Sequence, residues 1–166
     1  QFKGLPQFDW MEDIIDKLKL SSGAQATDVI GFDANIDLKG RNYVGELYQY
    51  IINRVVLKVE YFSFKWDKSM ITFHPHYMRQ YNNRWFVFGY NSDIGIEGWN
   101  MALDRICSIS PTNDVNYKES DICWREYFDD IIGVTNKSDA PVEEIVLHCY
   151  GSTGKYIETK PIHASQ

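Results

Sequence analysis

The sequence lacks long hydrophobic runs and paired cysteines, and each absence excludes a class of protein. No apolar run approaches the roughly 18–20 residues that a membrane-spanning helix needs, so we expect no partnership with a membrane. The three cysteines, Cys107, Cys123 and Cys149, are widely separated and form no CxxC pair. This pattern argues against a disulfide framework and a zinc site, and it favours reduced thiols in a cytoplasmic protein.

The sequence also lacks any recognisable catalytic constellation. Asp129 and Asp130 are adjacent, so on a helix their side chains diverge by about 100° and cannot face one another as an acid/base pair. The stretch "DANIDLKG" (Asp33–Gly40) lacks the glycine and the final glutamate of a calcium loop. His74 and His76 are correctly spaced to share a metal on a strand, but no third ligand lies nearby. We therefore expect no enzyme, no cofactor and no metal site.

The composition favours a folded domain rather than a disordered chain. Of the 166 residues, 44% are apolar and 15% are aromatic, which is ample for the core of one medium domain. The chain begins with Gln1 rather than Met and ends in "TKPIHASQ" without a terminating signal. We therefore expect it to be a fragment of a longer protein.

Acidic residues are absent from one long central stretch, although the formal charge of the whole chain is −6. No aspartate or glutamate occurs between Asp67 and Asp93. Within this gap, "HPHYMRQYNNRWFVFGY" (His74–Tyr90) holds two arginines, two histidines and many aromatic rings. The net charge argues against non-specific nucleic-acid binding over the whole surface, but this stretch allows a local cationic cleft.

Hydrophobic periodicity predicts helices first and then a run of short antiparallel strands. Two helices are predicted, one at Trp10–Leu20 and one over "NYVGELYQYIINR", in which Asn42 is a plausible cap. A short strand is expected at Val29–Phe32. Period-two alternation predicts further strands at Val55–Phe64, Ser69–Tyr81 and Arg84–Asn91, and one or two within Trp99–Ser110. The turn at Asn82–Asn83 makes a hairpin, and sequential short strands favour a small barrel.

The C-terminal third is less regular. "WREYFDDIIG" (Trp124–Gly133) is predicted to be a short helix closed by Gly133. "TNKSDAPVEE" is the best candidate for a linker. After it, "EIVLHCYG" (Glu144–Gly151) reads as a new strand, and "TGKYIETKPI" as a helix start or a loop.

The hairpin carries the pattern most typical of a binding site. An arginine beside aromatic rings on a sheet offers bidentate phosphate pairing together with stacking of a base. On alternation alone, Pro75, Tyr77, Arg79 and Tyr81 are predicted to share one face of their strand. The alternative is that the aromatic residues form the core and the arginines are merely solvated.

The same residues carry a resemblance to a known family. "HPHYMRQYNNRWFVFGYN", followed by "MALDRI", resembles the WYL domain of bacterial regulators, whose Trp-Tyr-Leu triplet corresponds here to Trp85-Phe86-Val87. The likeness extends upstream through "FKGLPQFDWMEDIIDKLK" and "VIGFDANIDLKG". Downstream, "EYFDDIIGVT" resembles the boundary with the extension that follows such domains, and "EEIVLHCYGSTGKYIETKPIHASQ" resembles the first part of that extension.

The resemblance implies an α+β fold with a small Sm-like, SH3-type antiparallel β-barrel and N-terminal helices, followed by a partial α/β C-terminal extension. It places an N-terminal helical segment at 1–22, the WYL-type barrel domain at 23–133 and the truncated start of the extension at 134–166. It also implies that the full protein binds DNA through a winged helix-turn-helix that is absent from this chain.

The resemblance further implies a site for an anionic nucleotide or single-stranded nucleic-acid effector. Carried over position by position, its residues are Tyr77, Arg79, Arg84, Trp85, Phe86 and Arg105. Two departures from the family pattern put the exact ligand in doubt. Phe86 lacks the hydroxyl of the usual tyrosine, and Trp99 lies near the place where related sequences often carry a cation.

We therefore expect a ligand-sensing regulatory domain of a bacterial transcriptional regulator, acting within a homodimer. The alternative is an oligomerisation or protein-interaction module without a small ligand. Uncompensated arginines would favour sensing, whereas arginines paired to Asp93, Glu97 or Asp104 would favour the alternative. The sequence does not identify the effector or the target genes, nor does it distinguish an activator from a repressor.

Overall fold

The computed structural model describes residues 39–64, 67–137 and 140–166. Contacts divide the chain into two units, Gln1–Asn35 and Ile36–Gln166, and every described residue belongs to the second. The helix expected at Trp10–Leu20 and the strand expected at Val29–Phe32 lie outside the described residues. No helix in the described part of the chain is long and apolar enough to cross a membrane.

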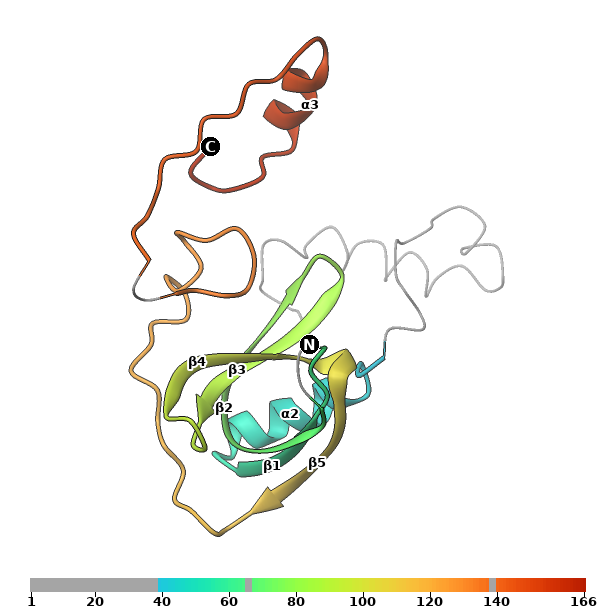
Figure 1. Ribbon diagram of the computed structural model, residues 1–166, viewed down its shortest axis with the longest axis vertical. Helices are drawn as coiled ribbons and strands as arrows, with labels where there is room; N and C mark the ends of the chain where they lie inside the picture. The colour runs from blue at the N-terminus through green and yellow to red at the C-terminus, as the bar shows by residue number, and fades with distance from the viewer. Residues whose placement is uncertain (1–38, 65–66, 138–139) are drawn as a thin grey trace, which may run out of the picture. The chain divides into compact units, whose positions relative to one another are not determined.

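Five antiparallel strands form a single curled sheet (Figure 1). They run in the order β4-β3-β2-β1-β5, so every pair of neighbours except β1 and β5 is also adjacent in sequence. A 3-10 helix, η2 (Leu103–Arg105), joins the two outermost strands. The strands are β1 (Val56–Tyr61), β2 (Ser69–Tyr81), β3 (Arg84–Asn91), β4 (Ile96–Ala102) and β5 (Ile106–Thr112).

The structure confirms the predicted hairpin, including the bounds of both strands. The turn residues Asn82 and Asn83 have positive φ angles of 46° and 57°, as a two-residue turn of the kind that matches the twist of the strands requires. Asparagine tolerates this left-handed conformation better than most residues. The α+β class is also confirmed, but β4 and β5 do not pair, so the sheet is open and is not the closed barrel that we expected.

A β-bulge interrupts β2 where the strand passes Pro75. The pairing with β3 shifts between Pro75 and Tyr77, so that one extra residue lies on β2. A bulge reverses which residues face each side of a sheet. The prediction that Pro75 shares a face with Tyr77 and Arg79 is therefore wrong, because Pro75 is fully buried while Tyr77 packs in a separate cluster on the outer face.

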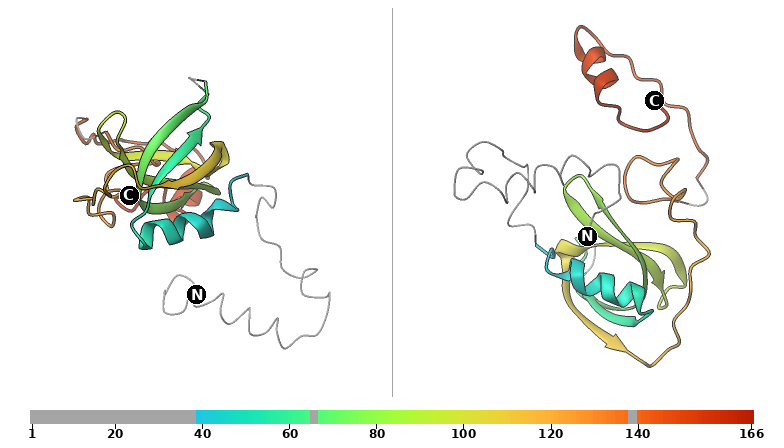
Figure 2. Two further views of the ribbon diagram at one scale, coloured as in Figure 1. Left: turned by 90° about the horizontal axis from the view of Figure 1, so that it is seen from below. Right: turned by 180° about the vertical axis from the view of Figure 1, so that it is seen from behind.

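The main core fills the concave side of the sheet. Helix α2 (Tyr43–Ile52) covers it through Leu47, which is fully buried, and lies beneath the curled sheet in the left view of Figure 2. The second predicted helix is thus confirmed, although the side chain of Asn42 makes no capping hydrogen bond. The buried residues of this cluster are Leu47, Leu57, Val59, Tyr61, Ile71, Phe73, Val87, Met101, Leu103 and Ile106.

A second cluster lies on the outer face of β2, β3 and β4, under a segment that we call the strap, residues 117–131. Phe86, Phe88 and Ala102 from the sheet pack there against Phe128 of the strap. The helix predicted at Trp124–Gly133 is wrong, because residues 124–130 form successive turns. In these turns, the aromatic rings of Trp124 and Phe128 pack against the sheet.

The C-terminal residues add one short helix, α3 (Thr153–Thr159), where the sequence allowed a helix start or a loop. The strand predicted at Glu144–Gly151 does not form, and its apolar residues Ile145, Val146 and Leu147 are exposed. A strand needs a partner to satisfy its backbone groups, and no described strand pairs with this segment.

Gly89 is required by close backbone approach at the bulge. It pairs with Pro75, and a Cβ there would lie 2.0 Å from the carbonyl oxygen of His74. We predict that Gly89→Ala lowers the free energy of unfolding by about 1–3 kcal/mol, as overpacking does. Urea denaturation measures the change.

The matched control is Gly45→Ala in α2, where an added Cβ meets nothing within 4 Å. Because glycine is unfavourable inside a helix, this control should gain about 0.5–1 kcal/mol. Equal effects at the two glycines would contradict the packing described at the bulge.

Candidate ligand site

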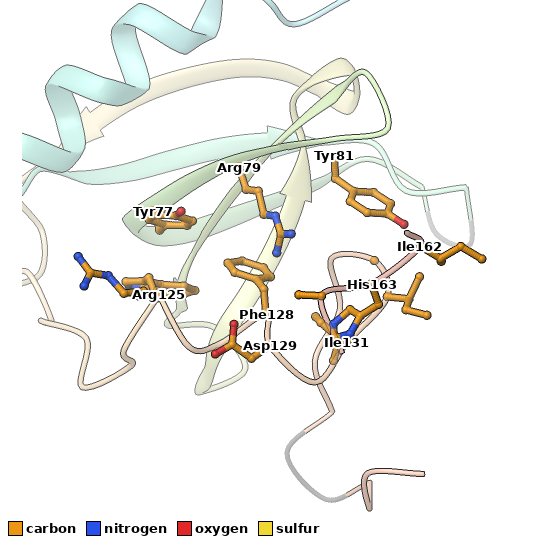
Figure 3. A pocket seen from close by; sticks show the side chains of 13 residues that line it. Tyr77, Arg79, Tyr81, Arg125, Phe128, Asp129, Ile131, Ile162 and His163 are labelled. Atoms are coloured by element: carbon orange, nitrogen blue, oxygen red, sulfur yellow. The ribbon is translucent and has the colours of Figure 1, made fainter. Parts of the chain in front are cut away.

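A cavity of about 480 Å³ lies between the outer face of β2 and the strap. β2 contributes Tyr77, Arg79 and Tyr81, which alternate along the strand after the bulge. Figure 3 shows the ring of Phe128 lying below the guanidinium of Arg79. The other lining residues come from the strap and the chain beyond it: Trp124, Arg125, Asp129, Ile131, Ile132, Gly133, Ile162, His163 and Ala164.

Arg79 is the central polar group of this cavity. Its Cζ lies 3.9 Å from the centroid of the Phe128 ring, which is a cation–π contact. Its Nη1 is buried and finds no hydrogen-bond acceptor among the residues that the structure describes. Since a buried, unpaired donor is costly, this guanidinium is suited to a ligand that supplies acceptor oxygens.

The walls of the cavity are aromatic. Trp124 stacks on Tyr77 with the rings nearly parallel, at 3°, and their centroids 5.4 Å apart. Phe128 packs edge-on against Phe88 at 5.2 Å. Arg125 and Asp129 are exposed at the edge of the cavity, and Figure 3 shows the Arg125 guanidinium pointing away from Arg79. The interior is thus a cation among rings.

The start of the strap is fixed to β2 by hydrogen bonds at the bulge. The backbone N–H of Lys118 donates to Nδ1 of His74 at 2.9 Å, and Nε2 of His76 bonds the carbonyl oxygen of Lys118 at 2.7 Å. The hydroxyl of Tyr117 donates to the carbonyl oxygen of Pro75 at 2.6 Å. Lys118 also forms an ion pair with Glu97, with Nζ and Oε1 2.8 Å apart.

These bonds determine the protonation states of the two histidines. Because Nδ1 of His74 accepts a hydrogen bond, the proton of its neutral ring lies on Nε2, which donates to Oγ of Ser92 at 2.6 Å. Burial lowers the pKa of His74, and the charges of His76 and Lys118 lower it further. Burial also lowers the pKa of His76 and raises that of Tyr117 to about 12.

Three of the six site residues predicted from the sequence lie on the outer face at this cavity. Tyr77 and Arg79 line it. Phe86 is directly across from Arg79 in the β2–β3 ladder and is buried in the outer cluster, so it supports the cavity floor rather than facing its interior.

The other three predicted residues lie elsewhere. Trp85 is on the opposite face of β3 and packs against the main core. The guanidinium of Arg84 pairs with Asp104, with Nε and Oδ1 3.5 Å apart. Arg105 lies between the rings of Tyr61 and Phe64, with its Cζ 5.4 Å and 5.2 Å from their centroids.

The strap residues Trp124 and Phe128 were not among the predicted site residues. The sequence did contain a signal for them, since Trp124, Phe128 and Ile131 recur at the spacing of one apolar face. In the structure, these three residues lie in the strap and line the cavity.

The two histidines should make stability depend on pH. The unfolded chain binds more protons than the folded one below the ordinary histidine pKa of about 6.5, because both folded pKa values are lowered. The stabilisation is therefore complete above that pH and decreases as the pH falls below it. We predict a lower urea midpoint at about pH 5.5 than at about pH 7.5.

A His74→Gln variant separates this effect from the titration of carboxyl groups. It removes one of the two titrating rings, so the change in urea midpoint between the two pH values should be smaller than in the wild type. A pH dependence identical in the two proteins would contradict the role given to His74.

Comparison with known proteins finds a family match over the residues of this sheet. Residues 42–111 match the WYL domain, a span that begins next to α2 and ends within β5. Among solved structures, the chain is similar to proteasome accessory factor B/C (PafBC) of Arthrobacter aurescens, with 20% identity and a TM-score of 0.42 over 55% of this chain and 14% of that one. No curated protein matches. The chain is thus similar to the WYL domain family through α2 and the five strands, a span of less than half of its 166 residues.

Proposed function

We propose that this chain is the ligand-sensing part of a bacterial transcriptional regulator and that its effector is an anionic nucleotide or a short single-stranded nucleic acid. The observation that carries the proposal is the guanidinium of Arg79. It has a buried Nη1 without an acceptor among the described residues, and it lies in a cavity walled by aromatic rings. An anionic group would supply the missing acceptor.

The size and chemistry of the cavity support a nucleotide-like ligand. Its volume of about 480 Å³ falls within the range of roughly 300–1,000 Å³ typical of small-molecule sites. Tyr77 and Trp124 line the cavity with planar rings that stack on one another, and a base can extend such a stack. No acidic residue occurs between Asp67 and Asp93, so β2 and β3 contribute no negative charge near Arg79. The cavity lining carries one carboxylate, Asp129, beside the two arginines Arg79 and Arg125.

Regulation follows if the effector prefers one arrangement of the full protein over another. We propose that the full protein is a cytoplasmic homodimer that carries a DNA-binding helix-turn-helix, as the resemblance to bacterial regulators implies. The open sheet described above would then correspond to the small Sm-like, SH3-type barrel of such regulators. Effector binding would change the orientation of the DNA-binding part.

One observation favours the alternative of a protein-interaction module. Arg84 is paired with Asp104, which is the arrangement expected if the arginines serve structure. It applies to Arg84 alone, since neither Arg79 nor Arg105 forms an ion pair among the described residues. The sensing proposal therefore rests on Arg79 and not on the whole cluster predicted from the sequence.

Replacing Arg79 should weaken effector binding without unfolding the protein. The probes are fluorescently labelled four-nucleotide DNA and RNA strands and a cyclic dinucleotide, titrated by fluorescence anisotropy over a salt series. We predict that Arg79→Ala weakens binding about ten- to a hundredfold, since hydrogen bonds to charged groups contribute about 1.5–3 kcal/mol. The salt slope should fall by about one.

Two further variants make this result specific. Lys68→Ala removes the same charge from an exposed side chain that pairs with Glu60, so it should leave binding nearly unchanged. Arg84→Ala tests whether the arginine that pairs with Asp104 of η2 takes part in effector binding. If the wild type binds none of the probes, or if Lys68→Ala weakens binding as much as Arg79→Ala does, the proposed site is wrong.

A further inference from the structure

Phe128 already occupies a face of the guanidinium on which a ligand ring would stack. We propose that Phe128 is an internal competitor of the effector, so that binding exchanges one ring for another on Arg79 and releases the strap. This inference rests on the proposed function and adds to it a class of ligand and a route of regulation.

The contacts of Phe128 are those of a ring held in a ligand position. It is 8% exposed, and Arg79 lies 3.9 Å from its centroid. Its other ring neighbours include Phe88 at 5.2 Å and Tyr77 at 5.9 Å. Stacking leaves Nη1 of Arg79 without a hydrogen bond, because a phenyl ring satisfies the charge but offers no acceptor. A ligand ring that carries an anionic group offers both a face for the charge of the guanidinium and an acceptor for Nη1.

The strap around Phe128 is held mainly by side chains. Residues 124–130 form turns rather than a helix, and the bond from the N–H of Ile131 to the carbonyl oxygen of Phe128 is long, at 3.5 Å. The shorter hydrogen bonds to the sheet lie at the other end, where Tyr117 and Lys118 bond to the bulge. Near Phe128, the hydroxyl of Tyr127 donates to the carbonyl oxygen of Gly98 on β4 at a longer 3.4 Å. The region near Phe128 can therefore move while residues 117–118 stay in place.

An incoming ring buries the aromatic surfaces that Phe128 leaves, so the main cost of the exchange is the exposure of the Phe128 ring itself. The exchange requires a ligand that has both a planar ring and an anionic group, which describes a nucleotide and excludes a simple polyphosphate. Beyond the strap, the chain is tied to β4, since the side-chain amide of Asn100 donates to the carbonyl oxygen of Val134 at 3.2 Å. The displacement is therefore confined to the strap.

Phe128→Leu separates a competitor from a wall of the site. Leucine keeps apolar volume under the sheet but has no π face for Arg79. Phe128→Ala serves as a second variant. If Phe128 competes, both variants bind a 5′-phosphorylated four-nucleotide DNA strand more tightly than wild type. Cation–π contacts correspond to about two- to thirtyfold in affinity.

Hydrogen exchange of the wild-type protein supplies an independent readout. Among residues 123–131, the amides of Glu126, Tyr127 and Asp129 are hydrogen-bonded and should lose protection when the phosphorylated strand binds. The amide of Lys118, which donates to His74, should keep its protection. Tripolyphosphate, which has the charge without a ring, should leave the protection of residues 123–131 unchanged.

The possible outcomes distinguish this inference from the proposed function. Binding that weakens in Phe128→Leu, with protection of residues 123–131 increasing on binding, would show that Phe128 is a wall and overturn the exchange alone. Equal affinity of the wild type and the variants would also overturn the exchange and leave the proposed function standing. Binding by neither wild type nor variants overturns both proposals. Binding only by the variants supports the competitor.

Discussion

The bulge at Pro75 is the constraint on which the rest of the molecule depends. It lets one strand of 13 residues place Ile71 and Phe73 in the main core and then present Tyr77 and Arg79 on the opposite face. Without the extra residue, strict alternation would turn Arg79 toward the core. The Pro75 carbonyl at the bulge accepts a hydrogen bond from Tyr117, and His74 and His76 on either side of Pro75 bond to Lys118, so the strap attaches where the strand changes face.

The energetics of the site depend on one charged group, the guanidinium of Arg79, whose hydrogen bonds are incomplete. A guanidinium among aromatic rings keeps part of its stabilisation through stacking, yet a buried donor without an acceptor remains a cost. Arg84, by comparison, has Asp104 nearby and has less to gain from a ligand. Two arginines close in sequence thus have different roles because their partners differ.

The sequence was sufficient for elements whose pattern is local, and it failed where burial depends on distant residues. The hairpin followed from alternation on both sides of Asn82–Asn83, and α2 followed from its apolar stripe. Alternation could not reveal which way the bulge would turn Tyr77. The spacing of Trp124 and Phe128 showed one apolar face, but a strap lying on a sheet gives the same spacing as a helix, and only the fold distinguishes them.

The open sheet has two outer strands, and β5 carries a feature that limits what can attach to it. Pro111 pairs with Leu57 of β1, so its missing N–H falls on the side away from the sheet. An additional strand from another molecule would find no donor at that position. A proline in an edge strand is a known protection against edge-to-edge aggregation. The protein can therefore leave its sheet unclosed without β5 becoming a template for fibre growth.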